Sequence, residues 1–354
     1  MSWRLLSLAA LFCTGLSSAV AQEQFSADPA PSVEQETPAE QTLTQKTPAG
    51  TKGQRGMAGM GGPGGGGGPG YFTTWFPSQP VDGRPDEVSI FRQNLSLGFP
   101  VWRGEGDMLI LNTDLRSTMY NTEVTLPRSG RQIPEQLWSV TVGTIFRHKF
   151  ENGWSGAALL NVGSSGDKPF NSLKELNGTV LAFLTVPSGE QNSWMFSLFY
   201  SPLSEIPFPI PGIAYGWYVD ETFQINLGIP FRVMWKPHPD VFVEASYMPV
   251  TTVHVQTGWK AFGGPLTIFG GYDWSNEAYQ FSDRASHKDR FFSYAMTLSA
   301  GLRYDFPKYG TIEVLGGYAF DRFLFIGQGY SDRNQDRLNL GAGPYLGANF
   351  RLRF

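Results

Sequence analysis

The chain ends in Asp336-Arg-Leu-Asn-Leu-Gly-Ala-Gly-Pro-Tyr-Leu-Gly-Ala-Asn-Phe-Arg-Leu-Arg-Phe354, and this segment has the clearest structural pattern in the sequence. From Leu338 onward every second residue is apolar or small, and the residues between are polar, aromatic or glycine. A period of two over this length predicts a β-strand with one apolar and one polar face. The strand exceeds the usual globular length of about 3–10 residues, and its apolar face continues to the last residue.

This segment resembles the final strand of bacterial outer-membrane β-barrels, in which a terminal aromatic and alternating apolar residues are recognised by the assembly machinery. The resemblance implies that Phe350, Leu352 and Phe354 form an assembly signal. It also implies two partners, outer-membrane lipid and the barrel-assembly machinery. On such a strand Arg351 and Arg353 point into the lumen, near its periplasmic mouth.

Residues 1–70 form two segments that lie outside the folded domain. Residues 1–21 have the pattern of a cleaved signal peptide: a short basic start, an apolar stretch and a small-residue cleavage site. The only cysteine, Cys13, lies within it, so we expect a mature chain without disulfides or cysteine metal sites. Residues 22–70 are rich in Pro, Gln and Thr and then in Gly, which predicts a disordered periplasmic linker. The Gly-rich run lacks the Gly-Lys-Ser/Thr ending of a phosphate-binding loop.

The composition also favours a barrel in lipid. Charged residues make up 16% of the chain, against about 25% in soluble proteins, and aromatic residues make up 14%. After residue 21 no apolar run reaches the roughly 18 residues of a spanning helix, so only a closed sheet could satisfy its backbone in a membrane. The formal charge of −4 excludes a nucleic-acid-binding footprint.

Residues 71–354 consist of aromatic-rich strands separated by turns. The sequence predicts thirteen strands, which span 88–99, 107–116, 136–150, 154–162, 178–186, 193–200, 219–229, 241–248, 251–261, 266–274, 291–306, 311–320 and 338–354. Short turns alternate with longer, more polar connections, as in a barrel whose short turns face the periplasm. Because both chain ends should be periplasmic, the strand number should be even. We therefore expect an all-β, closed antiparallel transmembrane β-barrel of about 12 strands (12–14), in which 71–76 could supply an additional strand.

Alternation within each strand predicts which side chains face the lumen. In residues 291–306 one face is apolar with aromatics at both ends, and the other is rich in Ser, Gly and charge, as a wet lumen requires. The polar lumen-facing candidates by this parity are Arg147, Glu244, His254, Lys260, Arg303, Asp305, Glu313, Asp321 and Arg351.

Two connections contain unusual residues. The Pro-rich segment 208–217 is interpreted as a rigid extracellular loop on the barrel rim, with an inward constriction as the alternative. Residues 275–290 contain many charges of both signs, which indicates a solvated loop whose salt bridges contribute little to stability. Such charges could also bridge lipopolysaccharide or gate an entrance.

Residues 89–354 resemble an uncharacterised domain family of outer-membrane proteins. The resemblance rests on the Pro-Ile-Pro-Gly loop at 209–212, Lys288-Asp-Arg290 and the motif Gly-Tyr-Ala-Phe-Asp-Arg at 317–322. Further matches are 227–231, 247–249 and 270–274. The family carries no assigned chemistry, so the resemblance transfers no catalytic residue. A structural Asp–Arg network at the rim is the expected role of Asp321 and Arg322.

The sequence contains no catalytic or metal-binding motif, and we expect no enzyme, no cofactor and no metal. Neither Gly-x-Ser-x-Gly nor His-Glu-x-x-His occurs, and His254 is the only histidine predicted to face the lumen in mid-strand. A pore or passive transporter for small solutes is the leading hypothesis. The alternative is a non-conducting barrel with a structural, anchoring or binding role, and a rim hydrolase using His254 or His287 comes third. The pattern gives no signal for the solute or for an oligomeric state.

Overall fold

The computed structural model describes residues 69–204, 206–248 and 252–353. The predicted signal peptide, nearly all of the predicted linker and the terminal Phe354 lie outside the described residues. No helix in the described part is long and apolar enough to cross a membrane.

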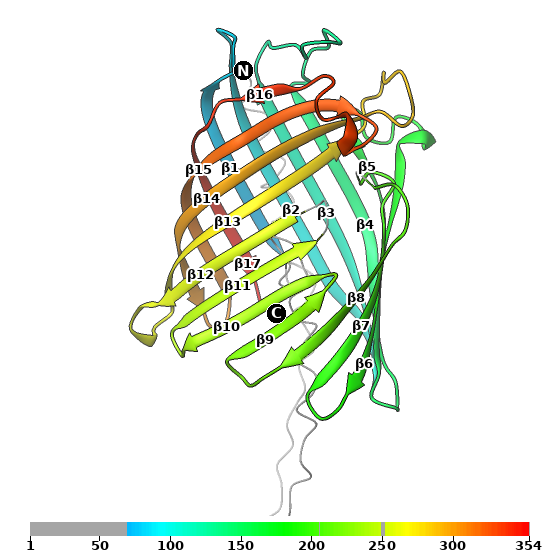
Figure 1. The fold of residues 1–354 in the computed structure, drawn as a ribbon, viewed down its shortest axis with the longest axis vertical. Helices are drawn as coiled ribbons and strands as arrows, with labels where there is room; N and C mark the ends of the chain where they lie inside the picture. Colours follow the sequence, from blue (N-terminus) through cyan, green and yellow to red (C-terminus); the bar gives the residue numbers. More distant parts are fainter. Residues whose placement is uncertain (1–68, 205, 249–251, 354) are drawn as a thin grey trace, which may run out of the picture. The chain divides into compact units, whose positions relative to one another are not determined.

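The described chain is built from strands and three single-turn 3-10 helices (Figure 1). The strands are β1 (Gly70–Pro80), β2 (Glu87–Arg103), β3 (Asp107–Asn121), β4 (Gln136–Lys149), β5 (Ser155–Gly166), β6 (Leu176–Ser188), β7 (Asn192–Tyr200), β8 (Ile210–Tyr218), β9 (Phe223–Gly228), β10 (Phe231–His238), β11 (Val241–Met248), β12 (Thr252–Lys260), β13 (Leu266–Tyr279), β14 (Arg290–Phe306), β15 (Gly310–Gly327), β16 (Leu338–Leu340) and β17 (Gly343–Leu352). The 3-10 turns are η1 (Leu173–Glu175), η2 (Ala261–Gly263) and η3 (Tyr330–Asp332).

These strands close into one antiparallel barrel. Each strand from β1 to β15 pairs with the next along the chain, and β1 pairs with β17 to close the ring. The short β16 and the longer β17 both pair with β15, so they are two parts of one wall strand, and the 17 strands fill sixteen wall positions. The closed antiparallel β-barrel expected from the sequence is thus confirmed, and the strand number is even.

The predicted number of about twelve strands is wrong, because three segments were not counted as wall strands. They are β1, considered only as an option, β8, interpreted as the Pro-rich loop, and β10, placed in a connection. Proline normally argues against a strand. In β8, Pro211 precedes the part that pairs with β9, which starts at Ala214. In β10, Pro237 lies where the pairing with β11 shifts register. At both positions the missing proline N–H therefore removes few of the hydrogen bonds between neighbouring strands.

The connections separate into a short-turn end and a long-loop end, as expected. At the short-turn end the connections span 104–106, 150–154, 189–191, 219–222, 239–240, 261–265 and 307–309. At the other end they span 81–86, 122–135, 167–175, 201–209, 229–230, 249–251, 280–289 and 328–337. The segments β9 to β12 are only 6 to 9 residues long, and Figure 1 shows them in the lower half of the wall.

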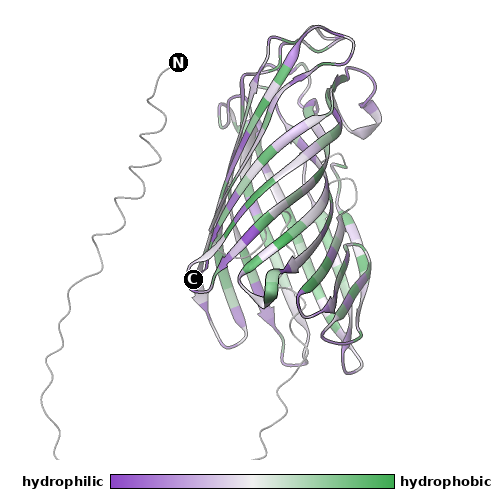
Figure 2. Ribbon diagram, turned by 90° about the vertical axis from the view of Figure 1, so that its left-hand side faces the viewer, coloured by the Kyte–Doolittle hydropathy of each residue, from purple (hydrophilic) through white to green (hydrophobic). Residues whose placement is uncertain are grey.

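The outer face of the wall is apolar. Leu298, Leu302, Val314 and Leu346 keep 51–59% of their surface exposed, and they alternate with inward residues such as Ser299 and Arg303. Figure 2 shows hydrophobic and hydrophilic segments alternating along the strands. Exposed aromatic side chains gather toward the short-turn end: Trp102, Trp154, Trp194, Trp235, Trp259 and Tyr304. An apolar band bordered by aromatic residues is the outer surface of transmembrane barrels.

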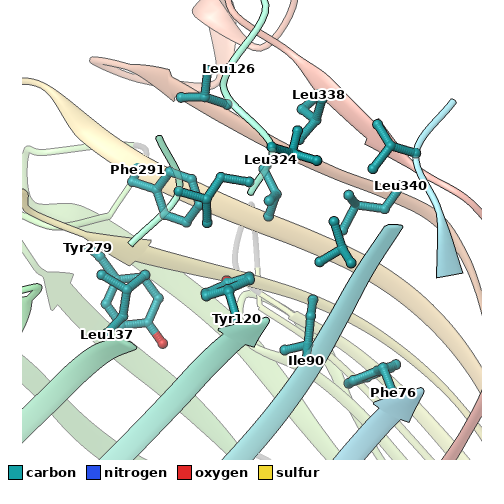
Figure 3. Close-up of a cluster of buried hydrophobic side chains, with 14 of the residues drawn as sticks. Phe76, Ile90, Tyr120, Leu126, Leu137, Tyr279, Phe291, Leu324, Leu338 and Leu340 are labelled. Atoms are coloured by element: carbon teal, nitrogen blue, oxygen red, sulfur yellow. The ribbon is translucent and has the colours of Figure 1, made fainter. Parts of the chain in front are cut away.

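The hydrophobic core lies inside the barrel at the long-loop end. It contains Phe76, Val81, Val88, Ile90, Tyr120, Val124, Leu126, Ile133, Leu137, Tyr279, Phe281, Phe291, Ala319, Leu324, Leu338, Leu340 and Tyr345. We call this cluster the plug. Figure 3 shows that its side chains come from several strands and point toward one another. Leu126 and Ile133 reach it from the β3–β4 connection and are almost fully buried. The lumen is therefore filled by apolar side chains at this end.

A contact across the lumen supports the same closure. Gly166 at the end of β5 forms a bridge with Gln280, which follows β13 on the opposite wall. The Gln280 amide donates to the Ser165 carbonyl at 2.8 Å, and the Ser282 amide donates to Asp167 at 2.7 Å. The opposite walls thus meet directly at the long-loop end.

Candidate functional site

A cavity whose wall contains many charged side chains lies within the barrel beside the plug. Its volume is about 440 Å³, and side chains from β1–β3, β10–β15 and β17 line it. The charged or ionisable residues in its wall are Arg92, Arg116, Arg232, Arg303, Arg351, Glu244, Asp273, Glu277, Glu313 and His254. The volume is within the range of about 300–1,000 Å³ that small-molecule sites occupy.

Five of the side chains that were predicted from strand alternation to face the lumen lie at this cavity. Glu244, His254, Arg303, Glu313 and Arg351 all line it. The other candidates, apart from Asp321, lie on the short-turn half of their strands and do not line the cavity: Arg147, Lys260 and Asp305. The outward Phe350 and Leu352 are exposed on β17.

Asp321 differs from its prediction, because the strand is irregular there. The β14–β15 register shifts between Tyr294 and Met296, and Asp321 adopts a positive φ of 43°. Its half-exposed carboxylate faces Arg337 at 3.6 Å, and it does not line the cavity. The following residue, Arg322, is 3% exposed. The expected Asp321–Arg322 network is therefore replaced by two separate sets of contacts.

Arg303 and Glu313 form the centre of one charge group in the cavity wall. They are directly opposite each other on β14 and β15, and Arg303 Nε donates to Glu313 Oε1 at 2.5 Å. Arg303 Nη2 also donates to Gln256 Oε1 at 3.1 Å, while Asn349 Nδ2 donates to Glu313 Oε2 at 3.2 Å. Glu313 is 5% exposed, so its charge depends on these partners.

His254 lies between two carboxylates on neighbouring strands. Its Nδ1 is 2.6 Å from Asp273 Oδ1 on β13, and its Nε2 is 3.9 Å from Glu244 Oε1 on β11. Arg232 Nη2 on β10 is 3.9 Å from the other oxygen of Glu244. Since both ring nitrogens face carboxylates and Arg232 faces one of these, the four side chains form one charge network.

A second charge group connects opposite walls below the plug. Arg116 Nη1 on β3 donates to Glu277 Oε1 on β13 at 3.1 Å, and Arg92 Nη2 on β2 is 3.8 Å from Glu277 Oε2. The Tyr279 hydroxyl donates to Glu277 Oε2 at 3.1 Å, and Arg92 Nη2 donates to Ser293 Oγ at 3.1 Å. These contacts join segments far apart in the sequence.

This second group was not predicted from the sequence. Glu277 was assigned to a solvated loop, whereas β13 continues to Tyr279 and turns Glu277 inward. Asp273, residue 275 and Glu277 alternate along one strand, and this alternation could have predicted that Glu277 faces the lumen. Arg92 and Arg116 lie within predicted strands, but their shared partner on a distant strand has no local sequence signal.

No protein-family model matches the chain, and no curated protein matches it. The resemblance to the uncharacterised domain family therefore stays a prediction. Among solved structures, the chain is similar to the beta domain of the Bordetella autotransporter Brka, with a TM-score of 0.32 and 10% identity over 81% of this chain and 99% of that one.

It is also similar to an outer membrane channel from Pseudomonas putida F1, with a TM-score of 0.33 and 10% identity over 81% of this chain and 96% of that one. The Pseudomonas putida toluene transporter TodX gives a TM-score of 0.28 and 13% identity, over 75% and 70% of the two chains. At these scores the likenesses carry no information about the solute or the activity of this chain.

Proposed function

We propose that the barrel spans the bacterial outer membrane. The support is the closed wall, which leaves no sheet edge, together with the apolar outer face and the aromatic residues near the short-turn end. In water, an apolar surface of this extent would favour aggregation. In this proposal the short turns face the periplasm, as is usual for barrels with alternating short and long connections.

We further propose that the lumen takes up small polar solutes for passage across that membrane. The observation that carries this proposal is the cavity of about 440 Å³, whose wall contains charged side chains from opposite sides of the barrel. Charged groups are costly to hold inside a membrane protein and usually mark a water-filled path or binding site. A barrel that served only as an anchor would have no need of such a wall.

In the described conformation the plug closes the lumen at the long-loop end. Among the described residues, its apolar side chains fill the lumen between the cavity and that end. Passage therefore requires the plug to move, for instance through displacement of the β3–β4 connection that carries Leu126 and Ile133. The same plug favours a second candidate function, a non-conducting barrel that binds or anchors.

Conductance in planar bilayers separates the two functions. We expect the wild-type chain to be nearly silent, because the plug is closed. The double variant Leu126→Asp/Ile133→Asp should raise the mean conductance about tenfold or more, because two buried carboxylates attract water into the plug. The matched control is Leu173→Asp, since Leu173 is 85% exposed outside the plug.

Each result has a defined meaning once heat-modifiable mobility shows that the variant is folded. A high conductance only in the plug variant supports gated passage. A folded plug variant as silent as wild type contradicts passage and favours the non-conducting barrel. Strong conductance of the wild-type chain would contradict closure by the plug.

A further inference from the structure

Arg92 and Arg116 line one side of the cavity, and Arg322 shares the Phe76 ring with Arg92, with too few carboxylates to neutralise the three side chains. Arg92, Arg116 and Arg322 carry three positive charges, and Glu277 is the acidic residue in contact with two of them. Asp114 lies two residues from Arg116 on β3 and accepts a hydrogen bond from Ser96. Even with Asp114 included, three arginines against two carboxylates leave one positive charge in excess.

Of these three positive charges, that of Arg322 is the least neutralised by carboxylates. It is 3% exposed, and its Nη1 donates to the Gln79 side-chain oxygen and, at 3.5 Å, to the Gly341 carbonyl. No carboxylate lies within salt-bridge distance of it among the described residues. Its guanidinium lies over the Phe76 ring at 4.6 Å, and Arg92 is 5.5 Å from the centre of the same ring. A buried guanidinium without a counter-ion is costly, which favours an anion nearby.

An unused hydrogen-bond donor occurs at the same place. The Nε of Arg92 is buried without a hydrogen-bond partner among the described residues, while the hydroxyl of Tyr120 lies within reach of Arg92 and Ser293. Buried donors of this kind are rare, and each requires an explanation such as a ligand or an ion. Arg92 lines the cavity, so a bound molecule there could reach it.

The rest of the cavity wall contains three arginines, three carboxylates and one histidine. The arginines are Arg232, Arg303 and Arg351, the carboxylates are those of Glu244, Asp273 and Glu313, and His254 lies between two of these carboxylates. On the side that carries Arg92 and Arg116, Glu277 is the carboxylate in contact with both arginines.

We propose that the cavity binds a small anionic solute, whose phosphate or carboxylate group is held by Arg92 and Arg116 while Arg322 adds its charge from behind Phe76. Planar guanidinium groups match both of these anions through paired hydrogen bonds. This inference names the solute class of the proposed passage and rests on that proposal. Its test measures binding and does not depend on conductance.

The test is calorimetric titration of the folded full chain in detergent micelles. The probes are inorganic phosphate and succinate, which distinguish a phosphate from a carboxylate ligand, and glycerol is the uncharged comparison. We expect one of the two anions to bind, glycerol not to bind, and added NaCl to weaken the binding. Arg116→Gln should weaken it about tenfold or more, as expected when a charge-assisted hydrogen bond is lost.

Glu277→Gln distinguishes anion binding from a purely structural ion pair. Removing this carboxylate raises the local positive charge, so the anion should bind several-fold more tightly. If the arginines only neutralised Glu277, neither variant would change anion binding. Arg147→Gln is the matched control, because Arg147 lies outside the cavity and its loss should leave the affinity unchanged.

Three results would overturn the inference: neither anion binds to the folded wild-type chain, Arg147→Gln weakens binding as much as Arg116→Gln, or Glu277→Gln abolishes binding. Arg92→Gln is a second variant if Arg116→Gln fails to fold. A barrel that conducts but binds neither anion would refute this inference and leave the proposed passage standing.

Discussion

Arg303 and Glu313 illustrate how single residues place charge inside the barrel wall. A directly opposite pair on adjacent antiparallel strands brings the two side chains together without help from more distant segments. Glu313 is 5% exposed, so its carboxylate depends on Arg303 and Asn349 for the hydrogen bonds that water would otherwise supply. Removing one partner should therefore cost more than removing both.

The first prediction concerns this pair. Arg303→Met should lower the free energy of unfolding by about 3 kcal/mol, because it leaves a buried carboxylate without its cation. The double variant Arg303→Met/Glu313→Leu should recover most of that loss. Denaturant unfolding in lipid vesicles measures both, and Arg147→Met should change stability by no more than about 0.5 kcal/mol. Equal stability of the single and double variants would show that the pair is not coupled.

A second prediction concerns Gly166, where the backbone itself allows the walls to meet. A Cβ atom on Gly166 would lie 2.0 Å from the Gln280 carbonyl oxygen, so the two backbones would have to separate. Gly166→Ala should therefore speed hydrogen exchange of the Gln280 amide, measured by mass spectrometry of a peptide that covers residues 278–290. In the control Gly178→Ala the nearest atom is 3.9 Å away, and exchange should not change. Unchanged exchange in Gly166→Ala would argue against the contact.

At the scale of elements, the regular strands were predictable and the irregular ones were not. β14 has a nearly continuous alternation, and its faces were assigned correctly from the sequence. β8 and β10 were missed because proline and short length hide their pattern. The bulge at Asp321 reversed one assignment, since one extra residue changes the face of the side chain.

Contacts across the lumen could not be predicted from the sequence, for a different reason. Alternation fixes which face a residue occupies, and it brought Glu244, His254, Arg303 and Glu313 to the cavity. It does not state which distant strand lies opposite. The Arg92–Glu277–Arg116 group and the plug both depend on which strands face each other across the closed ring, which is a property of the whole barrel.

The third prediction belongs to the last strand, β17. Its outward Phe350 and Leu352 are exposed, as an assembly signal requires, and Phe354 follows beyond the described residues. Deletion of Phe354 should reduce the amount of heat-modifiable barrel in the outer membrane several-fold. The same variant refolded from denaturant should have wild-type stability. Normal membrane levels of the deletion variant would refute the assembly signal.

For the whole molecule, the two faces of the wall determine the environment in which it folds. The outer face is apolar, the cavity is charged, and the plug separates that cavity from the long-loop end. A protein in water would need the reverse arrangement, with apolar side chains inside along the full length of the barrel. Passage and anion binding as proposed both require that the barrel is inserted in a membrane.

Membrane insertion can be measured through the quenching of a fluorophore by brominated lipids. Single cysteines at Leu298, Leu302 and Val314 on the outer face, and at Thr297 and Ser299 on the inner face, would carry the label after Cys13 is replaced by serine. We predict strong quenching at the three outer positions and little at the two inner ones in reconstituted vesicles. Equal quenching at both sets, or none at the outer set, would contradict a membrane-spanning barrel.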